Sequence, residues 1–320
     1  METKTKFELK LGMATREAFG KALVELGREN KDIMALDPDL SKSTFTSLFA
    51  KEFPDRFVEC GIAEANMLAI ASGLASSGKI PFASSFSCFA INKGFEQLRV
   101  TAAYPNVNVK VVGTHSGISI GEDGPSQMSI EDLGLACSLP GFTVLCPADE
   151  VSMHALVRRA AEHVGPVFIR AGRPKVAIVH AASQRFEIGE SVQLIDGHDV
   201  TIIATGLLVA EAIRAQESLE AESISARVID MYSIKPLDRS AIERAAKETH
   251  AIVVAEEHLV ASGLGVRVAQ VVAETKPCPM EFVGIRDTYA ESGTPEELLQ
   301  KYGLMASDIV AAVKRVLIRK

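Results

Sequence analysis

Tryptophan is absent from this chain of 320 residues, and aromatic residues make up only 6 % of it. The core must therefore be built mainly from Ala, Val, Ile and Leu, within an apolar content of 47 %. Such side chains suit α/β folds with parallel sheets, whose strands are covered on both faces. The length exceeds that of one ordinary domain and fits two of moderate size.

Other absences exclude whole classes of protein. The five cysteines are an odd number without a Cys-x-x-Cys pair, so they suggest neither a disulfide framework nor a zinc site, and they favour reduced thiols. The N-terminal stretch lacks the apolar segment of a signal peptide, and no run approaches the ~18 apolar residues of a membrane span. The net charge is −7, with no run of Lys or Arg. We therefore expect a cytoplasmic protein with no nucleic-acid partner and no membrane partner.

Apolar runs alternate along the chain with segments of helical periodicity. Before residue 174, strands are predicted over 33–36, 57–60, 81–84, 107–112, 143–145 and 167–170, and helices over 16–30, 63–77, 89–103, 129–138 and 148–163. The rhythm stops over 174–189. It resumes with strands over 200–204, 226–230, 251–255 and 280–283, and helices over 207–218, 240–248, 265–273 and the last ~25 residues. This order predicts an α/β fold with two domains, 8–175 and 191–320, joined by a linker at 176–190, each a mostly parallel sheet flanked by helices.

One loop concentrates residues that could carry chemistry. The segment from His115 to Gln127 holds three glycines, a histidine and two acids directly after a β-like run. In α/β folds, ligands bind beyond the carboxyl ends of the strands, where such loops gather. An irregular surface loop is the alternative.

Several other residues allow both a structural and a functional interpretation. Glu64 opens an apolar helix, where the helix dipole alone would favour an acid. Phe86 and Phe89 suit a core, or they could form a platform for a flat heterocycle. Three arginines near the ends of elements could be surface charges or guanidinium forks for a phosphate: Arg16, Arg170 and Arg173.

Several motifs follow one another in a single register over nearly the whole chain. They are ATREAFGKAL, STFTSLFAKEFPDRFVECGIAEANM, VVGTHSGISIGEDGPSQMSIEDL, PVFIRAGRPKVAIV, ARVIDMYSIKPLDR and VVAEEH. In these segments the sequence resembles the C-terminal half of transketolase. The motif GEDGPSQM is similar to the animal-type subgroup, because Gln127 stands where bacterial and yeast enzymes usually have His. The resemblance implies a thiamine-diphosphate pyrimidine-binding domain followed by the transketolase C-terminal domain.

The resemblance also implies one subunit of a split enzyme. The chain lacks a Gly-Asp-Gly followed further on by paired Asn, the pattern with which these enzymes hold Mg²⁺ and diphosphate. We therefore expect an N-terminal transketolase subunit to hold Mg²⁺ and the diphosphate, with the thiamine diphosphate shared between the two chains. No metal ligand is expected in this chain. Homodimerisation within an α2β2 heterotetramer is the expected assembly.

The family's site residues carry over onto matching positions. Glu64 matches the catalytic glutamate, whose carboxyl group on ring N1′ favours the tautomer that removes the thiazolium C2 proton; a dry environment would keep this carboxyl protonated more readily. Phe86 and Phe89 belong to the aminopyrimidine pocket, and Phe89 is the better candidate for stacking. Four residues match the positions that contact the substrate's phosphate: Arg16, Ser43, His115 and Arg173. Asp123 matches the residue that contacts the donor's C2 hydroxyl, and Gln127 stands at the position that contacts the donor near C1. Arg170 matches the family's phosphate-binding position less well than Arg173 does.

This set implies transfer of a two-carbon ketol unit from a ketose phosphate to an aldose phosphate. The sequence does not rank the central pentose phosphates above a branched or sulfonated sugar. An amide at Gln127 cannot serve as an acid or base at neutral pH. Three alternatives stay open: the β subunit of a 2-oxoacid dehydrogenase, an enzyme like deoxyxylulose-phosphate synthase, and a non-catalytic transketolase-like protein.

Overall fold

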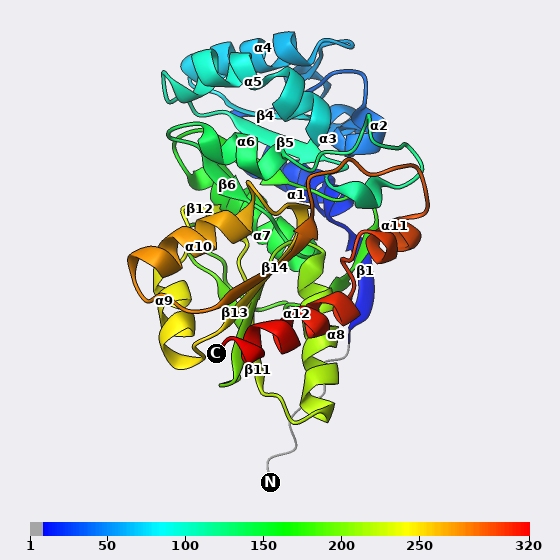
Figure 1. Cartoon of the computed structure of the whole chain (residues 1–320). Coiled ribbons are helices and arrows are strands. Elements are labelled where there is room, and N and C mark those ends of the chain that lie inside the picture. Colours follow the sequence, from blue (N-terminus) through cyan, green and yellow to red (C-terminus); the bar gives the residue numbers. More distant parts are fainter. Residues whose placement is uncertain (1–8) are drawn as a thin grey trace.

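The computed structural model of the protein describes residues 9–320, which form two large sheets flanked by helices and one small two-stranded sheet (Figure 1). The predicted domain start at residue 8, and most of the N-terminal stretch weighed as a signal peptide, lie outside the described residues. Within residues 9–320, no helix has the length and apolar character needed to cross a membrane.

The first sheet has seven strands in the order β12-β6-β7-β5-β4-β2-β3. Six are parallel to one another: β2 (Ile33–Asp37), β3 (Phe57–Glu59), β4 (Ile80–Phe86), β5 (Lys110–Thr114), β6 (Thr143–Leu145) and β7 (Val167–Arg170). The central strand β5 is buried along its whole length, as parallel strands covered on both faces are. The flanking helices are α1 (Thr15–Glu29), α2 (Ser41–Thr44), α3 (Thr46–Glu52), α4 (Glu64–Ser76), α6 (Asp132–Ser138) and α7 (Glu150–Glu162).

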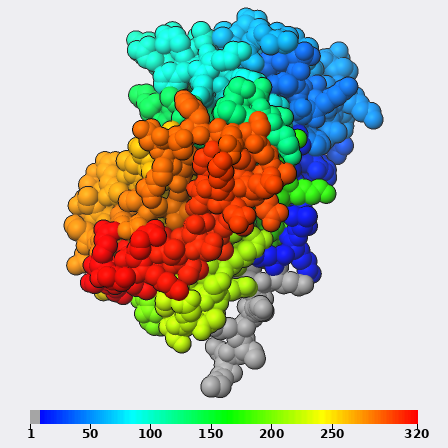
Figure 2. Space-filling view, turned by 45° about the vertical axis from the view of Figure 1, so that its right-hand side comes forward, coloured from blue at the N-terminus to red at the C-terminus, as the bar shows by residue number. Residues whose placement is uncertain are grey.

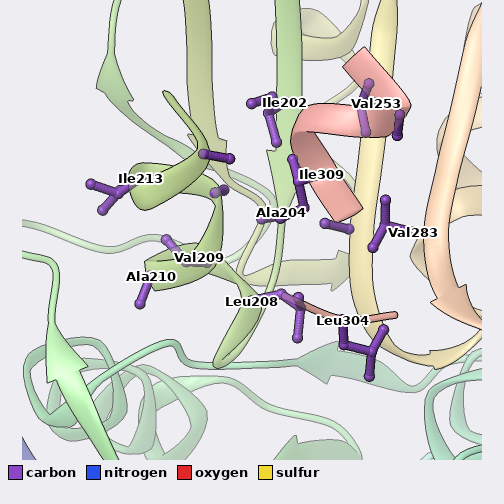
Figure 3. Packing of buried hydrophobic residues seen from close by; sticks show 14 of the residues in the cluster. Ile202, Ala204, Leu208, Val209, Ala210, Ile213, Val253, Val283, Leu304 and Ile309 are labelled. Carbon is purple, nitrogen blue, oxygen red and sulfur yellow. The ribbon is translucent and has the colours of Figure 1, made fainter. Parts of the chain in front are cut away.

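The second sheet has five strands in the order β14-β13-β10-β11-β9. Its parallel strands are β10 (Val200–Ala204), β11 (Ala226–Asp230), β13 (Ile252–Leu259) and β14 (Met280–Ile285), and β9 (Val192–Ile195) is an antiparallel edge. Its helices are α8 (Leu208–Ala221), α9 (Arg239–Glu248), α10 (Leu264–Glu274), α11 (Pro295–Lys301) and α12 (Ala306–Ile318). Ile309 of α12 packs over Ile202 and Ala204 of β10, beside Val253 of β13 (Figure 3). The prediction of two mostly parallel α/β domains is confirmed.

Short elements depart from the prediction. A strand that crosses the predicted boundary between the first domain and the linker, β8 (Lys175–Ile178), pairs antiparallel with β1 (Lys10–Ala14). A three-residue strand of the second half, β12 (Ser233–Lys235), pairs antiparallel with β6 and so extends the first sheet. Both pairings join segments far apart in sequence, so local periodicity could not reveal them. The helix predicted over 129–138 begins only at Asp132, and the last ~25 residues form two helices, not one.

The helix predicted over 89–103 is divided. It consists of the π-helix η2 (Cys88–Lys93), the short α5 (Phe95–Gln97) and a second π-helix, η3 (Leu98–Ala103). Gly94 lies at the break, and a side-chain carbon there would meet Leu68 Cδ1 of α4 at 2.1 Å. Glycine therefore lets this segment approach α4 closely. Wide turns of this kind are rare and are often found at functional sites.

Buried charges join the two halves of the chain. His180 lies between two carboxylates, with Nδ1 3.1 Å from Asp149 Oδ2 and Nε2 3.3 Å from Asp230 Oδ2, and all three side chains are fully buried. Asp149 caps α7 in the first domain, whereas Asp230 ends β11 in the second. Burial opposes the imidazolium, but the hydrogen bond to Asp149 and the nearby charges of Asp149 and Asp230 outweigh it and raise the pKa of His180 to about 9. The junction therefore contains a charged histidine at neutral pH.

This arrangement predicts that stability depends on pH through His180. An unfolded histidine titrates near ~6.5, so the folded chain keeps a proton between pH ~6.5 and about 9 that the unfolded chain has lost. The stabilisation is complete below pH ~6.5 and is lost as the pH rises through 9. Between these two pH values, the Tm of the wild type should fall by roughly 3–6 °C more than that of His180→Gln.

The exposed His198 provides the matched control for this comparison, since its side chain is 80 % exposed. His198→Gln should follow the wild-type pH curve in thermal unfolding. Parallel curves for the wild type and His180→Gln would show that the His180 proton does not stabilise the junction.

Candidate active site

The predicted site residues lie where parallel strands of the first sheet end. Phe86 is the last residue of β4, and it pairs in register with Thr114, the last residue of β5. His115 follows Thr114 directly, and Arg173 lies three residues beyond the end of β7. The carboxyl ends of neighbouring parallel strands meet at one edge of a sheet, which is where α/β proteins bind ligands. The sheet therefore brings these segments together.

Two arginines form the cationic part of the site. Arg16, in the first turn of α1, donates from Nη1 to the backbone oxygen of Ser43 at 2.6 Å and from Nε to that of Arg173 at 3.3 Å. Its guanidinium lies 5.2 Å from the centre of the Phe45 ring. Burial and the charge of Arg173 both lower the pKa of Arg16. An anion bound beside both guanidinium groups would relieve their repulsion, and planar forks suit phosphate oxygens.

Arg173 already has an acidic partner in the chain. It pairs with the exposed Glu122 at 2.8 Å and donates a hydrogen bond to the backbone oxygen of Ile120. Its side chain keeps 35 % of its surface exposed, so a ligand can reach it. The ion pair with Glu122 is the contact that an incoming anion would have to replace.

His115 joins the arginines to the aromatic residues. It is buried, adopts a left-handed backbone conformation (φ 57°), and stacks on Phe86 with ring centres 3.8 Å apart. Its Nδ1 lies 2.8 Å from the Thr114 hydroxyl oxygen. Burial, followed by the charges of Arg16 and Arg173, lowers the pKa of His115 to about 3. The imidazole is therefore neutral at physiological pH and can offer a hydrogen bond but no charge.

Two parallel rings and a buried carboxylate form the other part of the site. The rings of Phe86 and Phe89 are 7° from parallel, with centres 5.8 Å apart. Glu64 is the first residue of α4, and its side chain is only 4 % exposed. Its carboxylate is 2.6 Å from Lys93 Nζ, which in turn lies 5.4 Å from the centre of the Phe89 ring. A flat heterocycle with a hydrogen-bonding edge fits this combination of groups.

The second domain supports the glycine-rich loop. Glu257 of β13 accepts a hydrogen bond from the Ser119 backbone N–H at 2.6 Å. At Gly117 (φ 78°), a side-chain carbon would meet the Glu257 carboxyl carbon at 2.1 Å, so only glycine fits there. Gly121 lies against Pro295, the first residue of α11. Figure 2 shows this orange to red part of the second domain against the green and cyan first domain. Contacts with β13 and α11 of the second domain therefore help to fix the conformation of this loop of the first domain.

Two predicted sugar-binding residues are not hydrogen-bonded to the others within the described part of the chain. Asp123 is exposed, and Gln127 is half-buried and accepts a hydrogen bond from the Ser126 hydroxyl at 2.5 Å. Arg170, the weaker phosphate candidate, is 5 % exposed and pairs with the buried Asp132 at 2.9 Å. It also donates to the backbone oxygens of Ser129 and Glu257, and the second of these bonds links the two domains.

Asp37 is a supporting residue that the sequence reasoning missed. This fully buried carboxylate ends β2 and accepts hydrogen bonds from the Leu40 backbone N–H at 2.5 Å and from the hydroxyls of Thr44 and Thr46 at 2.6 and 2.8 Å. It thereby fixes the turn that carries Ser43. Burial raises the pKa of Asp37 to about 6, against the effect of these donors. An acid after a buried strand, followed by two threonines, was the available signal.

Comparison with known proteins shows similarity over most of the chain. The family model "Transketolase, pyrimidine binding domain" matches residues 12–178, and "Transketolase, C-terminal domain" matches residues 189–309. The chain is 42 % identical over 301 residues to the "Putative transketolase C-terminal section" of Methanocaldococcus jannaschii, covering 93 % of this chain and 94 % of that one. It is 38 % identical over 315 residues to the "6-deoxy-6-sulfo-D-fructose transketolase subunit SqwH" of a Clostridium species, covering 98 % of each.

A solved structure described as "Split gene transketolase, inactive beta4 tetramer" is also similar. It superimposes with a TM-score of 0.91 at 51 % sequence identity, covering 97 % of this chain and 100 % of that one. Both the sequence and the arrangement of elements therefore correspond over almost the full length of the two chains.

Proposed function

The chain belongs to the transketolase family, and we propose that it is the C-terminal subunit of a split, thiamine-diphosphate-dependent transketolase. In this proposal it transfers a two-carbon ketol unit from a ketose phosphate to an aldose phosphate, together with an N-terminal subunit. The observation that carries the proposal is the buried carboxylate of Glu64, which contacts Lys93 at 2.6 Å, with the ring pair of Phe86 and Phe89 on the other side of the same lysine contact, 5.4 Å from Lys93 Nζ to the centre of the Phe89 ring. We place the enzyme in the cytoplasm.

The aminopyrimidine end of the cofactor fits these residues. Glu64 would hold ring N1′ through its carboxyl group, and Phe89, the more exposed ring, would stack on the heterocycle. When bound, the cofactor supplies the nucleophilic carbon that receives and donates the ketol unit. Because the Glu64 side chain is only 4 % exposed, a hydrogen bond from this carboxyl group to the ring would be little weakened by competing water.

The cationic part of the site supports an anionic substrate. Arg16, Arg173 and the neutral His115 would bind the terminal phosphate, and the Ser43 segment would close around it. Asp123 and Gln127 would contact the sugar near C2 and C1. A sulfonate has the same tetrahedral shape, and one relative is named for a sulfonated sugar, so the substrate panel should contain both kinds of anion.

A partner chain completes the site in this proposal. The N-terminal subunit would hold Mg²⁺ and the diphosphate, within an α2β2 assembly in which copies of this chain also meet. One face of α4 is available for such docking, because Asn66, Ala69 and Gly73 are exposed at helical spacing. Ile62, which precedes this helix, is an apolar residue with 79 % of its surface exposed. Because Glu64 begins this same helix, a chain seated there would reach the cofactor's other end.

The cationic residues also bear on the alternatives. The β subunit of a 2-oxoacid dehydrogenase would share the architecture and the glutamate, but a 2-oxoacid has no phosphate for Arg16 and Arg173 to bind. Decarboxylation of pyruvate without ketol transfer would favour that alternative. Condensation of pyruvate with an aldose phosphate would indicate a deoxyxylulose-phosphate synthase-like enzyme. Absence of any turnover with the partner chain would indicate a non-catalytic protein.

Replacement of Glu64 tests the cofactor role. With its partner subunit present, Glu64→Ala should lose at least about a hundredfold of ketol-transfer kcat, because the ring loses the group that selects its reactive tautomer. Glu162→Ala is the matched control, since Glu162 is 64 % exposed on α7. Turnover of Glu64→Ala close to that of the control would refute the role of Glu64 in cofactor activation.

Replacement of Arg173 tests the phosphate contact. Arg173→Ala should raise KM for phosphorylated sugars by roughly tenfold to a hundredfold, since a charge-assisted hydrogen bond is worth about 1.5–3 kcal/mol. Arg28→Ala, which removes an exposed arginine paired with Glu52, should leave KM unchanged. An equal rise in KM for the same sugars without a phosphate would argue against a phosphate contact.

A further inference from the structure

Lys93 contacts both of the groups that the cofactor's ring would need. Its Nζ is 2.6 Å from Glu64 Oε2 and 5.4 Å from the centre of the Phe89 ring. The second distance is short enough for a cation–π interaction. The ammonium group therefore lies at the position where a heterocycle stacked on Phe89 would meet the Glu64 carboxylate.

The charges explain why this contact forms in the free chain. The Glu64 side chain is 4 % exposed, and a carboxylate so far removed from water is costly unless a cation or hydrogen-bond donors compensate it. Lys93 provides that compensation. Its own side chain is 56 % exposed, so its flexible stem can swing into solvent without leaving a buried charge behind. Loss of the contact would therefore cost Glu64 more than Lys93, because only the Glu64 charge would stay buried without a partner.

The local backbone brings the two residues together. Lys93 is the last residue of the π-helix η2, and Gly94 follows it against Leu68 of α4. The absence of a side chain at Gly94 lets η2 lie close to α4, whose first residue is Glu64. The ion pair is thus a product of the close packing of these two helices.

We propose that Lys93 is a positioning residue that neutralises and masks Glu64 in the free chain, and that the cofactor's ring displaces it when the enzyme assembles. The proposal rests on the proposed function, since it assigns Glu64 to the ring. One carboxylate oxygen cannot keep its short contact with the ammonium while it holds ring N1′. Binding of the cofactor therefore includes the cost of breaking the Glu64–Lys93 pair, and removal of Lys93 removes that cost.

The first arm of the test uses thermal unfolding of the isolated full chain. Lys93→Met should lower Tm by roughly 2–4 °C, because it leaves the Glu64 carboxylate buried without its cation. In the background of Glu64→Gln, which has no charge to compensate, the same replacement should change Tm by less than about 1 °C. Equal shifts in the two backgrounds would show that the pair does not couple the residues, and would overturn the proposal.

The second arm measures thiamine diphosphate binding by the assembled enzyme with Mg²⁺. Lys93→Met should bind the cofactor roughly threefold to tenfold more tightly than wild type, with kcat for ketol transfer little changed. Lys79→Met is the matched control, because Lys79 forms an exposed pair with Asp32 at 2.8 Å and should leave the affinity unchanged. If Lys93→Met does not fold, Lys93→Gln replaces it. Unchanged or weaker binding by the Lys93 variant would overturn the proposal.

The two arms distinguish failure of this proposal from failure of the proposed function. A wild-type pair of chains that transfers ketol units, combined with unchanged cofactor affinity in the Lys93 variant, refutes only the masking role. A wild-type pair without ketol transfer refutes the function, and with it the displacement by cofactor. The thermal unfolding arm then still decides whether Lys93 compensates Glu64.

Discussion

Parallel pairing of β4, β5 and β7 is the constraint on which the site depends. In this register Phe86 lies opposite Thr114, and Gly113 lies opposite Arg170, so the chain leaves all three strands at one edge of the sheet. Every segment that follows these strands must then share a small volume, which also receives the starts of α1 and α4. A shift of one residue in this pairing would turn Phe86 to the opposite face of the sheet and would displace His115 and Arg173, which follow β5 and β7. The placement of the residues proposed to bind ligands therefore depends on the register of this sheet.

Charge compensation within the chain is the second feature of the site. Glu64 is paired with Lys93, and Arg173 is paired with Glu122, before any ligand is present. Both pairs combine a group proposed to bind a ligand with a partner more than half exposed. Such partners can withdraw into water at small cost, whereas the proposed binding groups remain held by α4 and by the end of β7. The free chain is thus stable without a ligand and still able to exchange each internal partner for one.

The sequence predicted the two parallel α/β domains and most long elements, because buried strands and amphipathic helices each leave a local pattern. It could not predict β1, β8 and β12, which have only three to five residues and pair with distant segments. The resemblance located Arg16, Ser43, His115 and Arg173, and the structure brings Arg16 into contact with both Ser43 and Arg173. Lys93 was not predicted, because its contact with Glu64 depends on a π-helix that interrupts helical periodicity. A lysine at that position would otherwise be taken for an ordinary surface charge.

The central claim is that this chain holds one end of a cofactor whose other end belongs to a partner subunit. Calorimetric titration with thiamine diphosphate and Mg²⁺ tests this claim most directly, with the chain alone and mixed with its candidate N-terminal partner. The account predicts weak or undetectable binding by the chain alone, and tight, Mg²⁺-dependent binding by the mixture. Tight Mg²⁺-dependent binding by the isolated chain would contradict it.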